Sequence, residues 1–344
     1  MKKNCLAVIL AAVMMVTACG GGNGQGTNGD TEQREEKETF RVAFISDQEL
    51  DASEWLINLV EGVKKYEEEH ENVEIRMKEA VETNSYEPTI RSFAEEGYDI
   101  IITTYSSMAD ATVSVSKDYP NICFGSLDGT IDGIEAYSNI QEFGLNRTQT
   151  AYLAGIVGAY ASESKVVGMI GGNDEPVGNA ILAGWQQGLK SVNPDIVDYV
   201  SYARTYTDPT TGKDLGQALV DRGCDVIAGA AGGTSSGVAQ AANENQIFYV
   251  GWDTHYPDIF GENGLELGSA LNYFDVMVIA FIEDAIHGNF QGGQRVDYGM
   301  DSGVCDFDIC ENAEISEECK AAVEEALQQI KNGEIELSEE PLHK

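Results

Sequence analysis

The stretch Arg41-Val-Ala-Phe-Ile-Ser46, with the amphipathic segment that follows it over about 53–70, decides the fold. The first is a short apolar run with β-branched residues, which predicts a buried strand, and the second has the apolar period of a helix. The same pair of patterns recurs through most of the chain. Alternation of short strands and helices is typical of an α/β fold with parallel sheets.

Two series of such strand and helix units follow one another. In the first series we expect strands over 41–46, 73–78, 99–103 and 121–127, and helices over 53–70 and 86–96. In the second we expect helices over 147–161, 179–191, 212–221 and 237–243, and strands over 165–170, 198–202, 225–229 and 247–251. Each series has the length of a Rossmann-like lobe, and ligands of such sheets bind beyond the carboxyl ends of the strands.

Two later segments, 266–271 and 294–299, have strand patterns and are expected to return across the junction between the two series. We therefore expect two lobes joined by a hinge of several crossings. The first lobe would span about 40–145 with part of 252–344, and the second about 146–251 with the remaining C-terminal segments. Residues in the loops after strands would then face a cleft between the lobes.

The first eighteen residues have the pattern of a bacterial lipoprotein signal peptide: Lys2 and Lys3, an apolar run, and small residues before Cys19. The run is too short to span a hydrocarbon core of about 30 Å. We predict a lipid attached to Cys19, a flexible tether over 19–39, and a position on the extracytoplasmic face of the cell membrane. An uncleaved anchor helix is the alternative.

The formal net charge of −37 argues against nucleic acid or anionic lipid headgroups as partners. Beyond Cys19, Cys123 and Cys224 lie in apolar strand-like runs and are expected in the core, whereas Cys305, Cys310 and Cys319 are close enough in sequence for one disulfide. They lack paired CxxC spacing and a neighbouring histidine in sequence, so the spacing predicts no metal site.

No catalytic motif stands out. Only His255 of the four histidines follows an expected strand, and no serine lies in a Gly-x-Ser-x-Gly elbow. The glycine-rich stretch 229–237 lacks a P-loop lysine and dinucleotide spacing. We expect it to bring backbone amides close to a neutral ligand, with a purely structural turn as the alternative. We therefore expect neither an enzyme nor a bound cofactor.

Aromatic and acidic residues recur in the loops after strands. Trp55 and Tyr206 suit stacking on a planar base, and Asp47 and Asp253 suit paired hydrogen bonds from the hydroxyls of a sugar. For each aromatic taken alone, packing in the core is the alternative. The expected ligand-binding residues are Asp47, Asp51, Glu54, Trp55, Tyr105, Ser106, Asp128, Tyr206, Gly232, Asp253 and Asn272.

Several segments are shared with a known family. Tyr152-Leu-Ala-Gly155 and Asp208-Pro-Thr-Thr-Gly-Lys213 are the more specific ones, and Val42–Asp47, Gly184–Gly188 and Val250–Asp253 accompany them. In these the chain, from Phe40 onward, resembles the basic membrane protein family, also called purine nucleoside receptor A-like lipoproteins, which are substrate-binding proteins of ABC importers. The resemblance implies a type I periplasmic-binding-protein fold that closes on a nucleoside without catalysis.

The resemblance also assigns roles to single residues. Asp47 and Asp253 match the two aspartates that hold the ribose, and Trp55 stands where the family usually has a phenylalanine that stacks on the base. The segment 48–55 is one residue shorter than usual and lacks its glycines, so Asp51 and Glu54 are expected to contact the base in place of amides. Asn272 stands where the family often has a lysine, which removes a charge near the ribose.

We therefore expect a monomeric, lipid-anchored protein that captures a nucleoside, with a purine base, and delivers it to an ABC permease and its ATPase. One alternative is a binding protein for a sugar or another small polar ligand, since the fold does not fix the ligand. A second is a surface sensor lipoprotein. A third is an exported glycosidase in which Asp47 and Asp253 flank the scissile bond.

Overall fold

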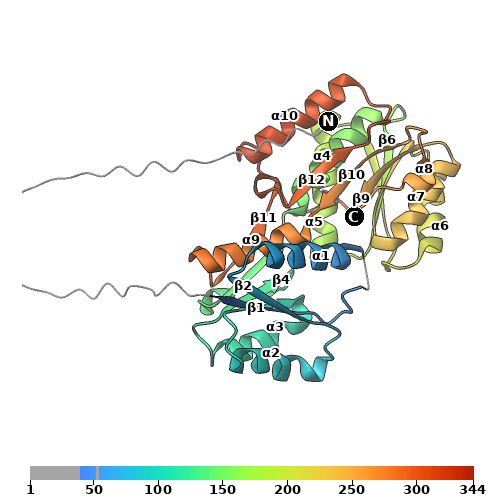
Figure 1. Ribbon diagram of the computed structural model, residues 1–344. Coiled ribbons are helices and arrows are strands. Elements are labelled where there is room, and N and C mark those ends of the chain that lie inside the picture. The colour runs from blue at the N-terminus through green and yellow to red at the C-terminus, as the bar shows by residue number, and fades with distance from the viewer. Residues whose placement is uncertain (1–38, 52–53) are drawn as a thin grey trace, which may run out of the picture. The chain divides into compact units, whose positions relative to one another are not determined.

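The computed structural model describes residues 39–51 and 54–344 (Figure 1). The segment that opens the sequence pattern forms β1, which pairs in parallel with β2 and β3. The first sheet has the order β11-β5-β4-β3-β1-β2, and every pairing in it is parallel. Its strands are β1 (Phe40–Ile45), β2 (Val73–Lys78), β3 (Ile100–Thr104), β4 (Cys123–Leu127), β5 (Ile140–Leu145) and β11 (Gln294–Tyr298).

The second sheet repeats the same plan with the order β12-β10-β9-β8-β6-β7. Only β12 runs antiparallel, on the edge beside β10. Its strands are β6 (Val166–Gly171), β7 (Val197–Tyr202), β8 (Val226–Ala230), β9 (Phe248–Trp252), β10 (Glu266–Asn272) and β12 (Cys305–Ile309). In both sheets the first five strands have the doubly wound order 2-1-3-4-5, so the expected α/β class with two Rossmann-like lobes is confirmed.

The alternation of side chains along β1 explains how helices cover both faces of the first sheet. Val42 and Phe44 belong to a core cluster with α1 (Glu54–Glu69) and α9 (Phe274–His287), while Ala43 and Ile45 pack with residues of the helices on the other face. Those helices are α2 (Tyr86–Glu95) and α3 (Ala109–Ser116), and Figure 1 shows them opposite α1. Burial on both faces favours a continuous apolar run.

The chain passes between the two sheets three times within the described residues. It runs from β5 through α4 (Arg147–Ala161) to β6 in the second sheet, and returns from β10 through α9 to β11 in the first. It then crosses a third time, from β11 to β12 in the second sheet. Of the two late segments expected to return to the first sheet, only 294–299 does so, as β11. The expectation for 266–271 was wrong, because β10 stays beside β9 after a connection that contains only α8 (Pro257–Phe260).

Helices α4 and α5 (Pro176–Val192) pack with their backbones in contact. A Cβ atom at Gly155, Gly184 or Gly188 would lie within 2.3 Å of a carbonyl oxygen of the other helix. The segments Tyr152–Gly155 and Gly184–Gly188 are therefore packing motifs that let two helices approach closely. The remaining helices are α6 (Pro209–Asp221), α7 (Ser235–Glu244) and α10 (Glu317–Lys331), of which α10 packs on α4.

The described residues contain no helix with the length and apolarity needed to cross a membrane. The five cysteines from Cys123 onward form no disulfide, so the bridge considered among Cys305, Cys310 and Cys319 is absent. Cys224 is buried as expected. Cys123, the first residue of β4, is only half-buried.

Candidate functional site

Asp47 lies just after β1 and is held by the segment that follows β3. Its Oδ2 accepts a hydrogen bond from Ser107 Oγ at 2.7 Å, and its Oδ1 lies 3.4 Å from Thr104 Oγ1. The neighbouring Ser106, which the sequence suggested, instead accepts a hydrogen bond from the amide of Thr130 at 3.0 Å. Ser106 therefore fixes the loop after β4, and Ser107 is the serine that positions the carboxylate.

Trp55, in the first turn of α1, contacts two other aromatic rings. Its ring centre is 4.7 Å from that of Phe274 at the start of α9 and 6.3 Å from that of Tyr105, which it meets edge-on. Trp55 is half-buried and packs against the main core cluster. The ring is therefore fixed in place by aromatic neighbours and still partly accessible.

Arg147, the first residue of α4, pairs with Asp128 directly after β4. Its Nη2 and Nη1 donate to Asp128 Oδ2 and Oδ1 at 2.7 and 3.2 Å, and both side chains are only 9% exposed. The guanidinium also lies 5.9 Å from the ring centre of Phe274. Asp128 is thus committed to a buried bidentate ion pair rather than open for a ligand.

The charge of Arg147 interacts with carboxylates at the ends of strands from both sheets. Burial disfavours its cation, but Asp128, and then Asp253 and Asp297, more than offset this and raise the Arg147 pKa. Burial raises the pKa of Tyr105, with Asp128 and Asp47 adding to the shift and Arg147 opposing it. One arginine at the start of the first crossing helix therefore interacts with carboxylates that follow β4 and β9.

Asp253 directly follows β9 and meets Asn272 at the end of β10. Asn272 Nδ2 donates to Asp253 Oδ1 at 2.6 Å, while Asn272 Oδ1 is buried and has no hydrogen-bond partner among residues 39–51 and 54–344. A buried acceptor without a donor costs free energy until a ligand or water supplies one. Asn272 Oδ1 is therefore an available hydrogen-bond acceptor beside Asp253.

Tyr206 and Gly232 lie together in the loops after β7 and β8. The Tyr206 hydroxyl donates to Glu175, and burial followed by that bond raises its pKa. Gly232 has φ = +53°, and a Cβ there would lie 3.2 Å from the Tyr206 carbonyl oxygen. Arg147 also influences the Tyr206 pKa, so this pair lies within electrostatic reach of the same cluster.

Backbone strain is concentrated at these strand ends. Tyr105, Asp128 and Asp253 follow β3, β4 and β9, and their φ values are +58°, +49° and +63°. A residue other than glycine adopts a positive φ at a cost of about 1–2 kcal/mol. Three of the predicted residues thus hold strained conformations at the sheet edge where ligands bind in this fold class.

Two predicted ligand-binding residues are not placed in the cluster. Asp51 is exposed and lines a groove between α1 and β2 together with Leu50 and Glu79. Glu54 begins α1, but its side chain lies outside what the structure describes, as do the signal peptide, the tether and Cys19. These assignments remain predictions.

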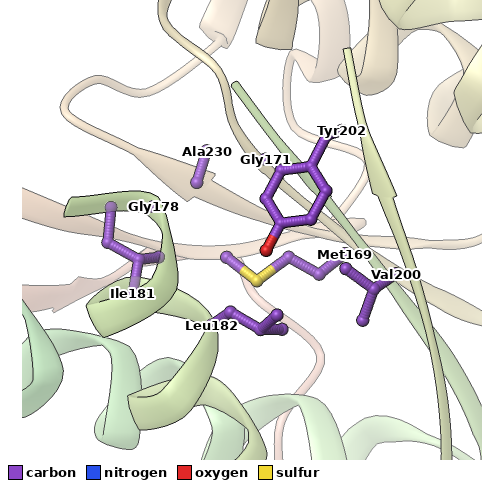
Figure 2. Close-up of a pocket in the computed structure, with 8 residues that line it drawn as sticks. All are labelled: Met169, Gly171, Gly178, Ile181, Leu182, Val200, Tyr202 and Ala230. Carbon is purple, nitrogen blue, oxygen red and sulfur yellow. The ribbon is translucent and has the colours of Figure 1, made fainter. Parts of the chain in front are cut away.

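An apolar pocket opens at the carboxyl ends of β6, β7 and β8, under the ring of Tyr202 (Figure 2). Its size is that of about one water molecule. Met169, Ile181 and Leu182 form its floor, and none of the predicted residues lines it. This pocket is part of the packing between α5 and the second sheet, too small for a ligand with a ring.

Sequence reasoning missed Arg147, Ser107 and Phe274. Arg147 carried a signal, because a cation in the first turn of a predicted helix opposes the helix dipole and needs a compensating carboxylate. Phe274 lies in α9, which the sequence pattern did not delimit, and Ser107 stands beside a serine of identical chemistry. Only the fold distinguishes these two serines.

Known proteins resemble this chain over most of its length. The model of the PnrA-like ABC transporter substrate-binding protein family matches residues 39–340. BmpA of Lactococcus lactis, an ABC transporter nucleoside-binding protein, is 27% identical over 363 residues, which cover 97% of this chain and 99% of that protein.

Solved structures show the same fold at lower identity. A solute-binding protein of an ABC transporter system from Conexibacter woesei has a TM-score of 0.69 at 18% identity and covers 88% of this chain and 99% of its own. One from Actinobacillus succinogenes with bound D-allose has a TM-score of 0.63 at 16% identity, with coverages of 82% and 100%. The expected type I periplasmic-binding-protein fold is confirmed, and the chain belongs to the PnrA-like family of ABC transporter substrate-binding proteins.

Proposed function

We propose that this substrate-binding protein captures a nucleoside, with a purine base, at the strand-end cluster and delivers it to an ABC permease. The observation that carries the proposal is the placement of two carboxylates, Asp47 after β1 and Asp253 after β9, each held by a neutral donor. Ser107 and Asn272 fix these carboxylates, and an ionised carboxylate has further lone pairs with which to accept hydroxyl protons.

The base would stack on Trp55. Phe274 and Tyr105 hold that ring in one orientation, so little side-chain entropy is lost when a ligand binds. A planar base covers such a ring better than a puckered sugar does. Stacking of one base on one aromatic side chain contributes about 1–3 kcal/mol in nucleic-acid binders.

The sugar would lie near Asp253 and Asn272. The unpaired Oδ1 of Asn272 needs a donor, which a ribose hydroxyl supplies. Arg147 is already neutralised by Asp128, so it is not a free cation for a phosphate. A neutral nucleoside therefore fits these charges better than a nucleotide does.

We further propose that the protein acts as a monomer, tethered by a lipid on Cys19 to the extracytoplasmic face of the membrane, without chemical conversion of its ligand. The short apolar run and the small residues before Cys19 support the anchor. Binding in this fold class proceeds by closure of two lobes around the ligand.

Titration calorimetry with adenosine, guanosine, inosine, uridine, D-ribose, D-glucose and D-allose tests the ligand class. We expect one purine nucleoside to bind per chain, far more tightly than any free sugar. Tight binding of a hexose without nucleoside binding would refute the nucleoside and leave the substrate-binding role intact. Chromatography of the nucleoside after incubation separates binding from hydrolysis, because an enzyme would release free base.

Tryptophan fluorescence locates the bound base. Trp185 is fully buried and Trp252 nearly so, which leaves Trp55 as the partly accessible indole of the described residues. We expect a nucleoside to quench emission in the natural protein and in Trp252→Phe, the matched control. The quenching should disappear in Trp55→Phe while calorimetric binding persists. Unchanged quenching in Trp55→Phe would place the base elsewhere.

A further inference from the structure

A second cluster of side chains able to bind a metal brings together the loop after β9, the start of β10 and the end of β12. His255 follows β9, Glu266 is the first residue of β10, and Cys310 comes directly after β12. The Cys310 Sγ lies 3.4 Å from His255 Nδ1, and Glu266 Oε1 lies 3.5 Å from the same nitrogen. One ligand atom from each of the three residues falls within 4.8 Å of the other two. We propose that these three side chains bind a zinc ion or a similar borderline-soft divalent cation.

The distances fit a tetrahedral ion. Ligand atoms bound to zinc at about 2.0–2.3 Å lie about 3.3–3.8 Å from one another. The two separations at His255 Nδ1 fall in that range before any adjustment. Thiolate, imidazole and carboxylate are also the three ligand types that zinc takes in proteins, whereas calcium and magnesium prefer oxygen alone.

Neighbouring groups orient the ligands as in a built metal site. His255 Nε2 lies 3.0 Å from Asp308 Oδ2, which favours the proton on Nε2 and leaves the Nδ1 lone pair directed toward Cys310 and Glu266. Both oxygens of the buried Glu266 accept from the amide of Tyr256, at 3.1 and 3.2 Å. A second carboxylate behind the histidine is the usual arrangement of zinc-bound imidazoles.

The cluster is accessible to an ion and leaves room for a fourth ligand. The His255 side chain is 28% exposed and Cys310 is half-buried, so a water molecule can complete the tetrahedron from solvent. The ion would join the loop after β9 to β10 and β12. That loop begins with Asp253, so the metal would fix the loop that carries a candidate ligand-binding carboxylate, although the metal site does not depend on the identity of the ligand.

The test uses the full chain with any affinity tag removed, reduced and freed of metal by a chelator. We expect calorimetry to show one zinc ion bound per chain. Cobalt added in place of zinc should give the near-ultraviolet charge-transfer band of a thiolate ligand and the visible bands of a tetrahedral ion. Absence of zinc binding, or cobalt binding without the thiolate band, would overturn the proposal.

Variants assign the ligands. We expect zinc affinity to fall at least 100-fold in Cys310→Ser and His255→Gln, and about 10–100-fold in Asp308→Asn, which removes only the outer partner. Cys123→Ser and His287→Gln are matched controls, because both residues lie on elements of the first lobe and should leave affinity unchanged. Binding that persists undiminished in Cys310→Ser and His255→Gln would also overturn the site.

The proposal can still be tested if one of these variants fails to fold. The cobalt spectrum of the unaltered chain reports the thiolate directly and needs no substitution. Melting curves provide a second measurement: zinc should raise the melting temperature of the natural protein and of Cys123→Ser, but not that of Cys310→Ser. An equal rise in all three would show that the ion binds elsewhere.

Discussion

Replacing Arg147 by methionine tests whether the buried ion pair supports the strand-end cluster. Arg147 and Asp128 are each 9% exposed and joined by two hydrogen bonds. Removing one partner of such a pair costs about 3–5 kcal/mol, because the other charge stays buried. Arg295 lies near Asp128 and compensates in part, so we expect a loss near the lower end, about 3 kcal/mol.

Calorimetric or circular-dichroism melting measures this loss. For about 300 folded residues the entropy of unfolding is about 0.6 kcal/mol/K, so Arg147→Met should lower the melting temperature by about 5 °C. Arg91→Met is the matched control, because Arg91 also donates two hydrogen bonds to carboxylates, one to Asp118 and one to Glu87, but at the surface. A fall in Arg147→Met no larger than in Arg91→Met would refute the reasoning.

Four further predictions follow from the site and the packing. Trp55→Ala should weaken nucleoside binding by about 1–3 kcal/mol in calorimetry; a loss of melting temperature with unchanged affinity would mean that the ring serves the core alone. Asp253→Asn should cost about 1.5–3 kcal/mol with a ribonucleoside and less with the deoxyribonucleoside; equal losses in the double-mutant cycle would show that Asp253 does not contact the missing hydroxyl. Cys19→Ala should move the protein from the membrane to the soluble fraction with ligand affinity unchanged, and full retention on membranes would contradict the anchor. Gly188→Ala should destabilise the fold by at least about 1–3 kcal/mol, because the new Cβ would lie 2.1 Å from the Tyr152 carbonyl oxygen; an unchanged melting curve would contradict that contact.

The strand ends that carry the site follow from local patterns. Val42 to Ile45 and Phe248 to Trp252 are short buried runs, and a carboxylate just beyond such a run lies at the carboxyl edge of a parallel sheet. Asp47 and Asp253 could therefore be placed from the sequence. The structure adds which strands lie next to β1 and β9, and so which residues surround the two aspartates.

Pairs of residues far apart in the sequence could not be predicted. Arg147 meets Asp128 because α4 starts beside the end of β4, and Cys310 meets His255 because β12 runs antiparallel to β10. The spacing of these residues along the chain predicts neither contact. For this reason the spacing of the late cysteines argued against a metal site, whereas the fold supplies Cys310 with a histidine and a carboxylate.

Helix α9 was missed for a different reason. Its sequence from Phe274 to Ile282 is almost wholly apolar, so it lacks the polar face by which an amphipathic helix is recognised. It is apolar because it packs beside α1 on one face of the first sheet, where Phe281 stacks on Phe143.

The position of β11 has a consequence for the way the chain is made. Until synthesis has reached Tyr298, the first sheet lacks β11, and the hydrogen-bonding groups of β5 on that side remain unpaired. By then every strand of the second sheet except β12 has emerged. A chain that stops early would present an exposed strand edge to its neighbours, which is a template for aggregation. Folding that begins only after the whole chain is available would let both sheets close together.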